Sequence, residues 1–560
     1  MTHDATSYDR SFGGLVRDKT QSNIPVKSAY GPADLEGFDY ERDAGDPGTP
    51  PFTRGIYPEM YRGSLWLKSF IVCYATPEET NRAFKKYIAA GQTGLRVLTD
   101  TSTLSGVDPD HPLARYDIMC NGNPTFALTE YETMLDGIAL EDIDFESANS
   151  TPSGSFFTYV FLVALMEQRK ADISRLRGTN INDPVHAFIV YGTPEFSPDL
   201  ARRVNLDLIE FGIRHTPKWH PCTPCGYDMR DAGITSPQEM AFVIANALQY
   251  YGDAVAERGV RFEEFRPMVF SMSAESDFFE TVAKFRATRR LWARMARERL
   301  GATSPRSMAC RIGIRTAGNS IYPQKPLNNT ARITLQVLAA VLGGVQSIDP
   351  SGIDETFGLP SEESRIFELD LQHIIAHESN VPLTADPLGG SYYVESLTTR
   401  LETAAAALLE EIDRLGGMWK CLESGWLRQQ FDRATTEIQG EINERQRLIV
   451  GANAFQGPDG PISRAIVDGA YKVPSDEKRF GAIERVRQLR QTRDAAAVQR
   501  RLGELAAAVR EGRNIVRSTI EAAKVYATLG EMVGTIRMAH GLPFDPYARI
   551  SAPQFLQVGE

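Results

Sequence analysis

Two cysteines and two aspartates lie close together in the segment CTPCGYDMRDAG, residues 222–233. Cys222 and Cys225 have C-x-x-C spacing, and His215 and His220 lie just upstream. Cysteine and histidine are common zinc ligands, and C-x-x-C is also the spacing of redox-active thiol pairs, so both kinds of site are alternatives here. The sequence contains no second C-x-x-C. We therefore favour a third interpretation, in which the segment is the polar lining of a different site and binds no metal.

The residues that follow predict where this segment lies in the fold. Ser236, Pro237 and Glu239 have the pattern of a helix start, with Ser236 as the N-cap, and apolar residues then recur at helical spacing. This helix start places Asp228 at the carboxyl end of the fourth predicted strand. In barrels of alternating strands and helices, that end carries the functional residues. The alternative is that Asp228 only caps the segment after it.

Short apolar segments rich in strand-forming residues alternate with helical patterns along much of the chain. Eight strands are predicted, at residues 94–100, 143–149, 177–181, 220–226, 266–272, 308–314, 345–349 and 381–386. Such alternation is typical of an α/β protein with a parallel sheet. Eight units favour a closed (β/α)8 TIM barrel over an open sheet, and no glycine-rich dinucleotide motif or phosphate-binding loop supports the open sheet.

Three parts of the chain differ in their patterns. Residues 1–50 are polar and end in a stretch rich in proline and glycine, which predicts an extended N-terminal arm. The predicted barrel occupies residues 51–400. Residues 401–560 carry helical patterns and predict a helical C-terminal region.

The composition disfavours several classes of protein. The 72 acidic residues outnumber the 61 basic ones, and the formal net charge of -11 disfavours binding to nucleic acid and to anionic membranes. No apolar run approaches the roughly 20 residues that span a bilayer, and the N-terminus lacks the apolar segment of a signal peptide. Six cysteines in 560 residues do not form a disulfide framework. We expect a reduced, cytoplasmic protein.

Seven segments carry a resemblance to a known family. They are PFTRGIYPEMYRGSLW (51–66), AAGQTGLRVLTDTSTLSGVDPDHP (89–112), GTNIND (178–183), PKWHPCTPCGYDMRDAG (217–233), FFETVAKFRATRRLWARM (278–295), DPLGGSYYVESLT (386–398) and ATLGEM (527–532). They resemble the large, substrate-binding subunit of the adenosylcobalamin-dependent acyl-CoA mutases, the family of the methylmalonyl-CoA, isobutyryl-CoA and 2-hydroxyisobutyryl-CoA mutases.

The resemblance implies a (β/α)8 barrel and an isomerase that uses adenosylcobalamin to start a radical rearrangement of an acyl thioester. In the family, cobalamin is held by a domain with a D-x-H-x-x-G motif, and no such motif occurs here. A separate cobalamin-binding small subunit is therefore implied, in an assembly such as a dimer of heterodimers. The family also has serine-like channel residues at the strand of Cys222 and Cys225, which favours polar lining over a metal site.

Several positions depart from the family pattern. Asp228 stands where the family has a histidine that bonds the thioester carbonyl. Either burial keeps Asp228 protonated, or it meets a donor such as a hydroxyl or an amine. Tyr191 replaces the arginine that holds the free carboxylate of methylmalonyl-CoA, which disfavours that substrate. Ile71 stands where the methylmalonyl-CoA mutases have a tyrosine that wedges against the corrin. An isoleucine at this position resembles the 2-hydroxyisobutyryl-CoA mutases, but Leu98 replaces the acid that those enzymes have on the first strand.

On the predicted strand at 308–314 and just after it, Gly313 and Arg315 stand where the family has a histidine and a glutamine. The three alternatives for Arg315 are a pair with Asp228, a bond to an anionic substrate group, and a surface position. The resemblance assigns the site residues to three roles: catalytic (Asp228, Tyr191, Ile71, Arg315), substrate-binding (Tyr57, Leu98, Ile181, Gln346) and cofactor-binding (Asp100, Gly313, Glu355).

The arginines that lie near the CoA phosphates in the family are replaced by Ser64, Ser69 and Pro267, with Arg62, Lys68 and Arg266 nearby. The predicted substrate is therefore an acyl thioester of CoA or of a carrier protein, other than methylmalonyl-CoA. The alternative function is a catalytically silent paralogue that binds an acyl group or the cobalamin-carrying subunit.

Overall fold

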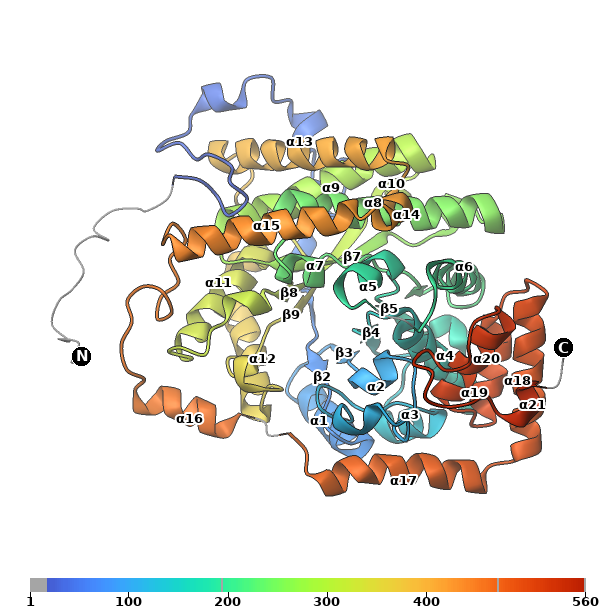
Figure 1. The fold of residues 1–560 in the computed structure, drawn as a ribbon. Coiled ribbons are helices and arrows are strands. Elements are labelled where there is room, and N and C mark those ends of the chain that lie inside the picture. The colour runs from blue at the N-terminus through green and yellow to red at the C-terminus, as the bar shows by residue number, and fades with distance from the viewer. Residues whose placement is uncertain (1–17, 193–194, 471–472, 558–560) are drawn as a thin grey trace.

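The computed structural model describes residues 18–192, 195–470 and 473–557. In these residues nine strands form two sheets near the centre of the molecule, with helices around them (Figure 1). One sheet has the order β1 (Leu67–Lys68), β9 (Ser347–Asp349), β8 (Cys310–Thr316), β7 (Met268–Ala274). The other has the order β2 (Ile71–Val72), β3 (Gly94–Val97), β4 (Asp144–Ser147), β5 (Arg177–Asn180), β6 (Trp219–His220). Every pairing within them is parallel, as the alternation of strands and helices predicts.

The two sheets meet at two places. Only Ser69 and Phe70 separate β1 from β2, so one stretch of chain passes from the first sheet to the second. The Ser69 amide donates to the carbonyl of Ile348 at 3.1 Å, which continues the pairing with β9 through this gap. On the other side, a parallel bridge between Cys225 and Ser271 connects the segment after β6 to β7.

Helices follow most strands and pack outside the sheets (Figure 1). The longer ones between residues 77 and 377 are α1 (Pro77–Ala89), α4 (Pro152–Gln168), α6 (Pro198–His215), α8 (Ser236–Arg258), α9 (Phe278–Leu300), α11 (Asn328–Leu342) and α12 (Glu362–His377). Short helices lie between strand and long helix or beside them: α2 (Thr101–Leu104), α3 (Leu128–Met134), α5 (Pro184–Val190), α7 (Tyr227–Asp231) and α10 (Pro305–Met308).

The C-terminal part of the chain is helical in the residues that the structure describes. Its helices are α13 (Tyr392–Arg414), α14 (Met418–Glu423), α15 (Trp426–Asn443), α16 (Pro461–Gly469), α17 (Asp476–Thr492), α18 (Ala495–Arg510), α19 (Val516–Lys524), α20 (Leu529–Ala539) and α21 (Gln554–Gln557). They do not form one separate body. α13 packs against α8 and α9, whereas α19 packs against α4, so the region covers helices in two distant parts of the molecule (Figure 1).

Two large hydrophobic clusters fill the space between sheets and helices. One lies among β7, β8, α8, α9 and α13, and the other among β3, α1, α4, α6 and the helices α18 to α20. The sequence of α4 shows why this helix is central to the second cluster. Its residues 156–166 are apolar on all sides apart from Thr158 and Tyr159, and a helix without a polar face must be buried.

The described part of the N-terminal arm packs on the ends of two helices. The backbone amide and the hydroxyl of Ser22 both donate to the carboxylate of Glu280 near the start of α9, at 3.0 and 2.6 Å. The Ser22 hydroxyl also accepts from the backbone amide of Ser236 in the first turn of α8, at 3.0 Å. The arm thereby supplies a partner for a helix N-terminus, which otherwise has unsatisfied amides.

Three sequence-based expectations need correction. The segment 381–386 is not a strand, because residues Val381–Leu383 form a 3-10 turn that contains Pro382, a residue without an amide to donate to a ladder. β1 and β2 together form a strand that was not predicted and that precedes all the predicted ones. Counted with it, the strand before Asp228 is the fifth along the chain, not the fourth. The N-cap of α8 is Thr235 rather than Ser236, and Thr235 forms a capping box with Gln238.

Among the described helices, none combines the length and the apolar character needed to cross a membrane.

Candidate active site

The short helix α7 carries Asp228 in its first turn, close to the carboxyl end of the strands. The chain leaves β6, makes the bridge at Cys225, and enters α7 directly after Gly226. The Gly226 amide donates to the Ser271 carbonyl at 2.7 Å, which holds this turn against β7. A side chain at position 226 would collide with Glu239, since a Cβ there would lie 2.6 Å from the Glu239 Cγ. Glycine therefore allows α7 to start this close to α8.

Asp228 lies beside a histidine that comes from another element. His186 is in α5, and its Nε2 atom is 2.9 Å from the Asp228 Oδ2. The Cys225 thiol and the Ser150 hydroxyl each lie 3.5 Å from the same carboxylate oxygen. The His186 side chain is fully buried, whereas 21% of the Asp228 side chain is exposed. The cluster is therefore closed on the protein side and open to solvent at the carboxylate.

One buried carboxylate positions both the histidine and the cysteine. Asp183 is the N-cap of α5 and accepts from the His186 amide at 3.2 Å and from the Cys225 amide at 2.9 Å. It also accepts from the Tyr250 hydroxyl at 2.6 Å and from the Asn246 side-chain amide at 3.0 Å. Because a buried carboxylate is stable only when its oxygens are satisfied, this arrangement fixes the two elements relative to each other.

The mutual contacts decide the charges in the cluster. Burial favours a neutral Asp228, but the hydrogen bond and charge of His186, with hydrogen bonds from Cys225 and Tyr191, outweigh burial and lower the pKa of Asp228. Burial alone would lower the pKa of His186, yet the adjoining Cys225 and Asp228 raise it well above its usual value. Burial and the charge of Asp228 raise the pKa of Cys225. An ionised Asp228 beside a protonated His186 follows, which argues against a carboxyl kept protonated by burial.

Two more predicted residues border this cluster. Tyr191 is the C-cap of α5, and its ring meets that of His186 edge-on with centroids 5.7 Å apart. Although nearly half of Tyr191 is exposed, burial and the charge of Asp228 raise the pKa of its hydroxyl well above the usual value. Ile181 packs in a small buried cluster with Cys225 and Tyr227. The structure thus brings Asp228, Tyr191 and Ile181 together.

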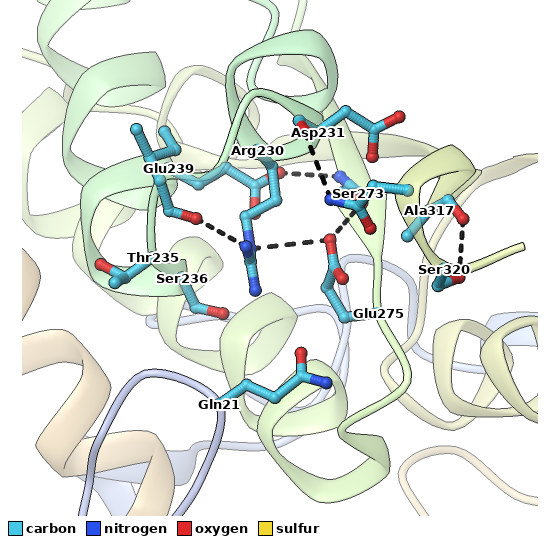
Figure 2. A network of polar contacts seen from close by, with 12 residues as sticks. Gln21, Arg230, Asp231, Thr235, Ser236, Glu239, Ser273, Glu275, Ala317 and Ser320 are labelled. Atoms are coloured by element: carbon cyan, nitrogen blue, oxygen red, sulfur yellow. Dashed lines mark hydrogen bonds and ion pairs between the residues drawn. The ribbon is translucent and has the colours of Figure 1, made fainter. Parts of the chain in front are cut away.

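A second polar network holds the rest of α7 (Figure 2). Arg230 donates from Nη1 to the Ile234 carbonyl at 2.6 Å, and its Nε is 3.6 Å from Glu275 Oε1. The Asn319 side-chain amide donates to the Asp231 carbonyl at 3.4 Å. Burial and the charge of Glu275 raise the pKa of the Asp231 carboxyl to about 7. These contacts fix the helix from which Asp228 projects.

Arg315 does not pair with Asp228. It follows Gly313 on β8, where it is the register partner of Asp349, and its guanidinium forms ion pairs with Asp349, at 3.6 Å, and with Glu355. The same guanidinium lies over the Tyr227 ring, 5.5 Å from its centroid. Only 13% of the side chain is exposed, so Arg315 is not a surface residue either.

The remaining predicted residues occupy three further places. Ile71 and Leu98 belong to one small apolar cluster with Cys73 and Ala148. Asp100 is the fully buried N-cap of α2, and its carboxylate accepts from the amides of residues 103 and 119. The third place is a separate cavity.

This cavity has a volume of about 530 Å³ and lies against the segment 57–67. Tyr57, Gln346 and Gly313 line it, together with two basic residues, Arg266 and Arg311. The Arg311 Nε donates to the Tyr57 hydroxyl at 3.0 Å. Burial and the charge of Arg311 lower the pKa of Arg266 to about 10. The cavity therefore combines apolar walls with charges of both signs, since Glu59, Asp144 and Glu146 line it as well.

The C-x-x-C pair is split between two environments. The Cys222 thiol donates to the Asn182 carbonyl at 2.9 Å, whereas Cys225 belongs to the Asp228 cluster. Both cysteines are free thiols. His215 packs against Phe211 in α6, and burial lowers the pKa of His220 to about 3. The zinc set considered from the sequence is therefore not assembled among the described residues.

The sequence reasoning missed His186. A single histidine in an apolar stretch gives no signal by itself, but Asn182-Asp183-Pro184 before it has the pattern of a helix start. That pattern places residue 186 in the first turn of a helix that begins at the carboxyl end of β5, the same edge of the sheet as Asp228.

Comparison with known proteins decides the family. The family model described as methylmalonyl-CoA mutase matches residues 19–542. The chain belongs to the methylmalonyl-CoA mutase family. It is 36% identical over 503 residues to the 2-hydroxyisobutanoyl-CoA mutase large subunit of Aquincola tertiaricarbonis, covering 90% of this chain and 88% of that one. It is 34% identical over 504 residues to the methylmalonyl-CoA mutase of Cereibacter sphaeroides, covering 90% and 69% of the two chains.

A third relative, like the first, is named as a large subunit. The methylmalonyl-CoA mutase large subunit of Porphyromonas gingivalis is 33% identical over 512 residues, covering 91% of this chain and 70% of the relative. All three relatives are named mutases, which are isomerases, and the family depends on cobalamin. The resemblance seen in the sequence segments is therefore confirmed at the level of the family.

Proposed function

We propose that this chain is the large subunit of an adenosylcobalamin-dependent radical mutase that rearranges the carbon skeleton of an acyl thioester other than methylmalonyl-CoA. The observation that carries the proposal is the 2.9 Å contact between the His186 Nε2 and the carboxylate of Asp228, which stands where the family has a carbonyl-binding histidine. The fold fits the proposal. The junctions at β1–β2 and at Cys225–Ser271 support one (β/α)8 barrel within residues 51–400, preceded by the arm at 1–50 and followed by the helical region at 401–560.

The cavity beside Tyr57 is suited to the long arm of a thioester. Arg266 and Arg311 supply positive charge where the phosphates of CoA, or the phosphate of a carrier protein's prosthetic arm, would lie. Apolar walls suit the chain between phosphate and sulfur. Gly313 contributes no side chain to this lining, and a Cβ there would be in ordinary contact with Ser347, at 3.6 Å.

The acyl end of the substrate would meet two contrasting surfaces. Ile71 and Leu98 provide an apolar side, and Asp228 provides an acceptor. An ionised carboxylate accepts hydrogen bonds and cannot donate one, so it selects a hydroxyl or an amine on the substrate rather than a bare carbonyl. The free carboxylate of methylmalonyl-CoA would be repelled by the carboxylate of Asp228, and Tyr191 would offer it no positive charge.

The residues at the carboxyl ends of β8 and β9 fit a nucleoside-bearing cofactor. Glu355 keeps 24% of its side chain exposed beside Arg315, and a carboxylate is a suitable acceptor for ribose hydroxyls. Adenosylcobalamin, when bound, supplies the radical that starts the rearrangement by hydrogen abstraction. We propose that a cobalamin-binding small subunit carries it to this face, in an assembly such as a dimer of heterodimers. Asp228 and the apolar cluster would hold the acyl group in place and keep water from it.

The test is an isomerisation assay on the chain combined with its cobalamin-binding small subunit and adenosylcobalamin. Methylmalonyl-, isobutyryl-, 2-hydroxyisobutyryl- and 2-aminoisobutyryl-CoA are compared at equal concentration, with products separated by mass spectrometry. We expect turnover of a hydroxylated or aminated substrate and none of methylmalonyl-CoA. Binding of these thioesters without turnover of any of them would instead support the catalytically silent paralogue.

A further inference from the structure

Three side chains with metal-binding atoms, one of them Asp228, lie close together and come from three different parts of the chain. His186 comes from α5, Cys225 from the segment after β6, and Asp228 from α7, and their candidate ligand atoms all lie within 4.8 Å of one another. The His186 Nε2 and the Cys225 Sγ are 2.9 and 3.5 Å from the Asp228 Oδ2. This set differs from the C-x-x-C set considered in the sequence, because Cys222 is absent from it and His186 is new.

We propose that His186, Cys225 and Asp228 bind one zinc ion, with the fourth coordination position open. Zinc takes imidazole, thiolate and carboxylate ligands at about 2.0–2.3 Å in a tetrahedral arrangement, which places neighbouring ligand atoms roughly 3.3–3.6 Å apart. Two of the three separations, 2.9 and 3.5 Å, lie close to this range, and the third, between His186 and Cys225, is within 4.8 Å. A mixed nitrogen, sulfur and oxygen set suits zinc better than magnesium or calcium, which prefer oxygen alone.

The surrounding structure has the features of a prepared site. Asp183 accepts from the amides of both His186 and Cys225, so two of the three ligands are held by one buried carboxylate. Outer contacts of this kind orient ligands in metal sites. Charge is balanced as well, because a thiolate and a carboxylate neutralise the two charges of zinc, and the protons of the thiol and the imidazolium pass to solvent.

Three protein ligands and an open position are typical of zinc sites that act on a substrate rather than only support a fold. Solvent reaches the cluster at Asp228, and the Tyr191 ring borders it. If the chain is the mutase proposed above, an ion here would offer its open position to the hydroxyl or amine of the substrate. That role depends on the proposed function, whereas zinc binding does not.

The experiment uses the full-length chain, purified without metal and loaded with one equivalent of Zn²⁺ or Co²⁺. Zinc is measured by mass spectrometry after passage through a chelating column, and Co²⁺ by its absorption spectrum. We expect one zinc per chain and a thiolate-to-cobalt charge-transfer band. His186→Gln and Cys225→Ser should each weaken binding by at least about tenfold, since even outer residues of zinc sites cost about 10–100-fold.

Cys222→Ser is the matched control, because this neighbouring thiol bonds the Asn182 carbonyl and not the cluster, and it should keep both signals. A chain that retains no zinc and shows no charge-transfer band would overturn the proposal and leave a hydrogen-bonded cluster. Equal retention by Cys225→Ser would overturn it too, since the zinc would then be bound elsewhere. The wild-type cobalt spectrum decides the question even if a variant fails to fold. None of these measurements depends on turnover, so they can fail while the isomerisation assay succeeds.

Discussion

Replacement of Asp228 by asparagine tests the centre of the proposed site. The substitution keeps the shape of the side chain and removes its charge, which leaves the fully buried His186 without the partner that now lies at 2.9 Å. Loss of one member of a buried ion pair typically costs about 3–5 kcal/mol. Because 21% of the Asp228 side chain is exposed, we expect a value below that range, about 2 kcal/mol of unfolding free energy.

A double variant separates charge balance from chemistry. Asp228→Asn combined with His186→Gln removes both charges, so most of the lost stability should return, with a coupling energy of about 1–3 kcal/mol between the two positions. Urea unfolding followed by circular dichroism measures all four members of this cycle. Turnover should behave differently from stability. Asp228→Asn should lower it by roughly 10²-fold, the effect of losing a positioned polar group, and the double variant should not recover it.

The assay is product formation from the substrate that the wild type turns over fastest, with cobalamin subunit and cofactor present at saturation. Full activity of Asp228→Asn on that substrate would refute the reasoning, since the carboxylate would then serve only to balance His186. Recovery of activity in the double variant would refute it equally, because the defect would come from an unbalanced buried charge.

Three further predictions concern other parts of the molecule. Burial lowers the pKa of His220 to about 3 in the folded chain, so below pH about 6.5 the unfolded state binds a proton that the folded state does not bind. Between pH 7 and pH 5 the wild type should therefore lose about 2 kcal/mol more unfolding free energy than His220→Gln. Equal losses of the two proteins in urea unfolding would contradict this. Methylmalonyl-CoA should be turned over at least about three decades more slowly than the best substrate, since Tyr191 offers no charge; comparable rates in the coupled assay would show that the substitution does not decide specificity. The chain alone should not bind adenosylcobalamin tightly, and stoichiometric binding in a titration without the small subunit would contradict the two-component proposal.

The alternation of strands and helices could be predicted because each βα unit carries its own local pattern. The strand formed by β1 and β2 was missed, since each part has only two residues and the pattern of alternation needs a longer window. The error at 381–386 has the opposite cause. Three apolar residues in a row suggested a strand there, although Pro382 within them cannot donate to a ladder.

The placement of Asp228 was predictable because a helix start follows it closely in the chain. Its partner was not, since His186 lies 42 positions earlier and reaches Asp228 only because β5 and β6 are neighbours in the sheet. The register of neighbouring strands is set by the whole sheet and not by either segment, so a pair of this kind stays invisible in a local pattern.

Arg315 shows how the partners of a charge, rather than its presence, decide what a site can bind. The chain has Tyr191 where the family has an arginine, and it has Arg315 where the family has an uncharged glutamine. From the sequence alone, Arg315 could therefore bind an anionic group of the substrate. In the structure its guanidinium already faces the carboxylates of Asp349 and Glu355 and covers the Tyr227 ring. An anionic substrate group would have to compete with these two carboxylates for the guanidinium, which disfavours its binding. Asp228 is thus paired with His186, and Arg315 with its two acids. A substrate with a neutral donor fits such a site, because the exposed edge of Asp228 can accept one more hydrogen bond without breaking either pair.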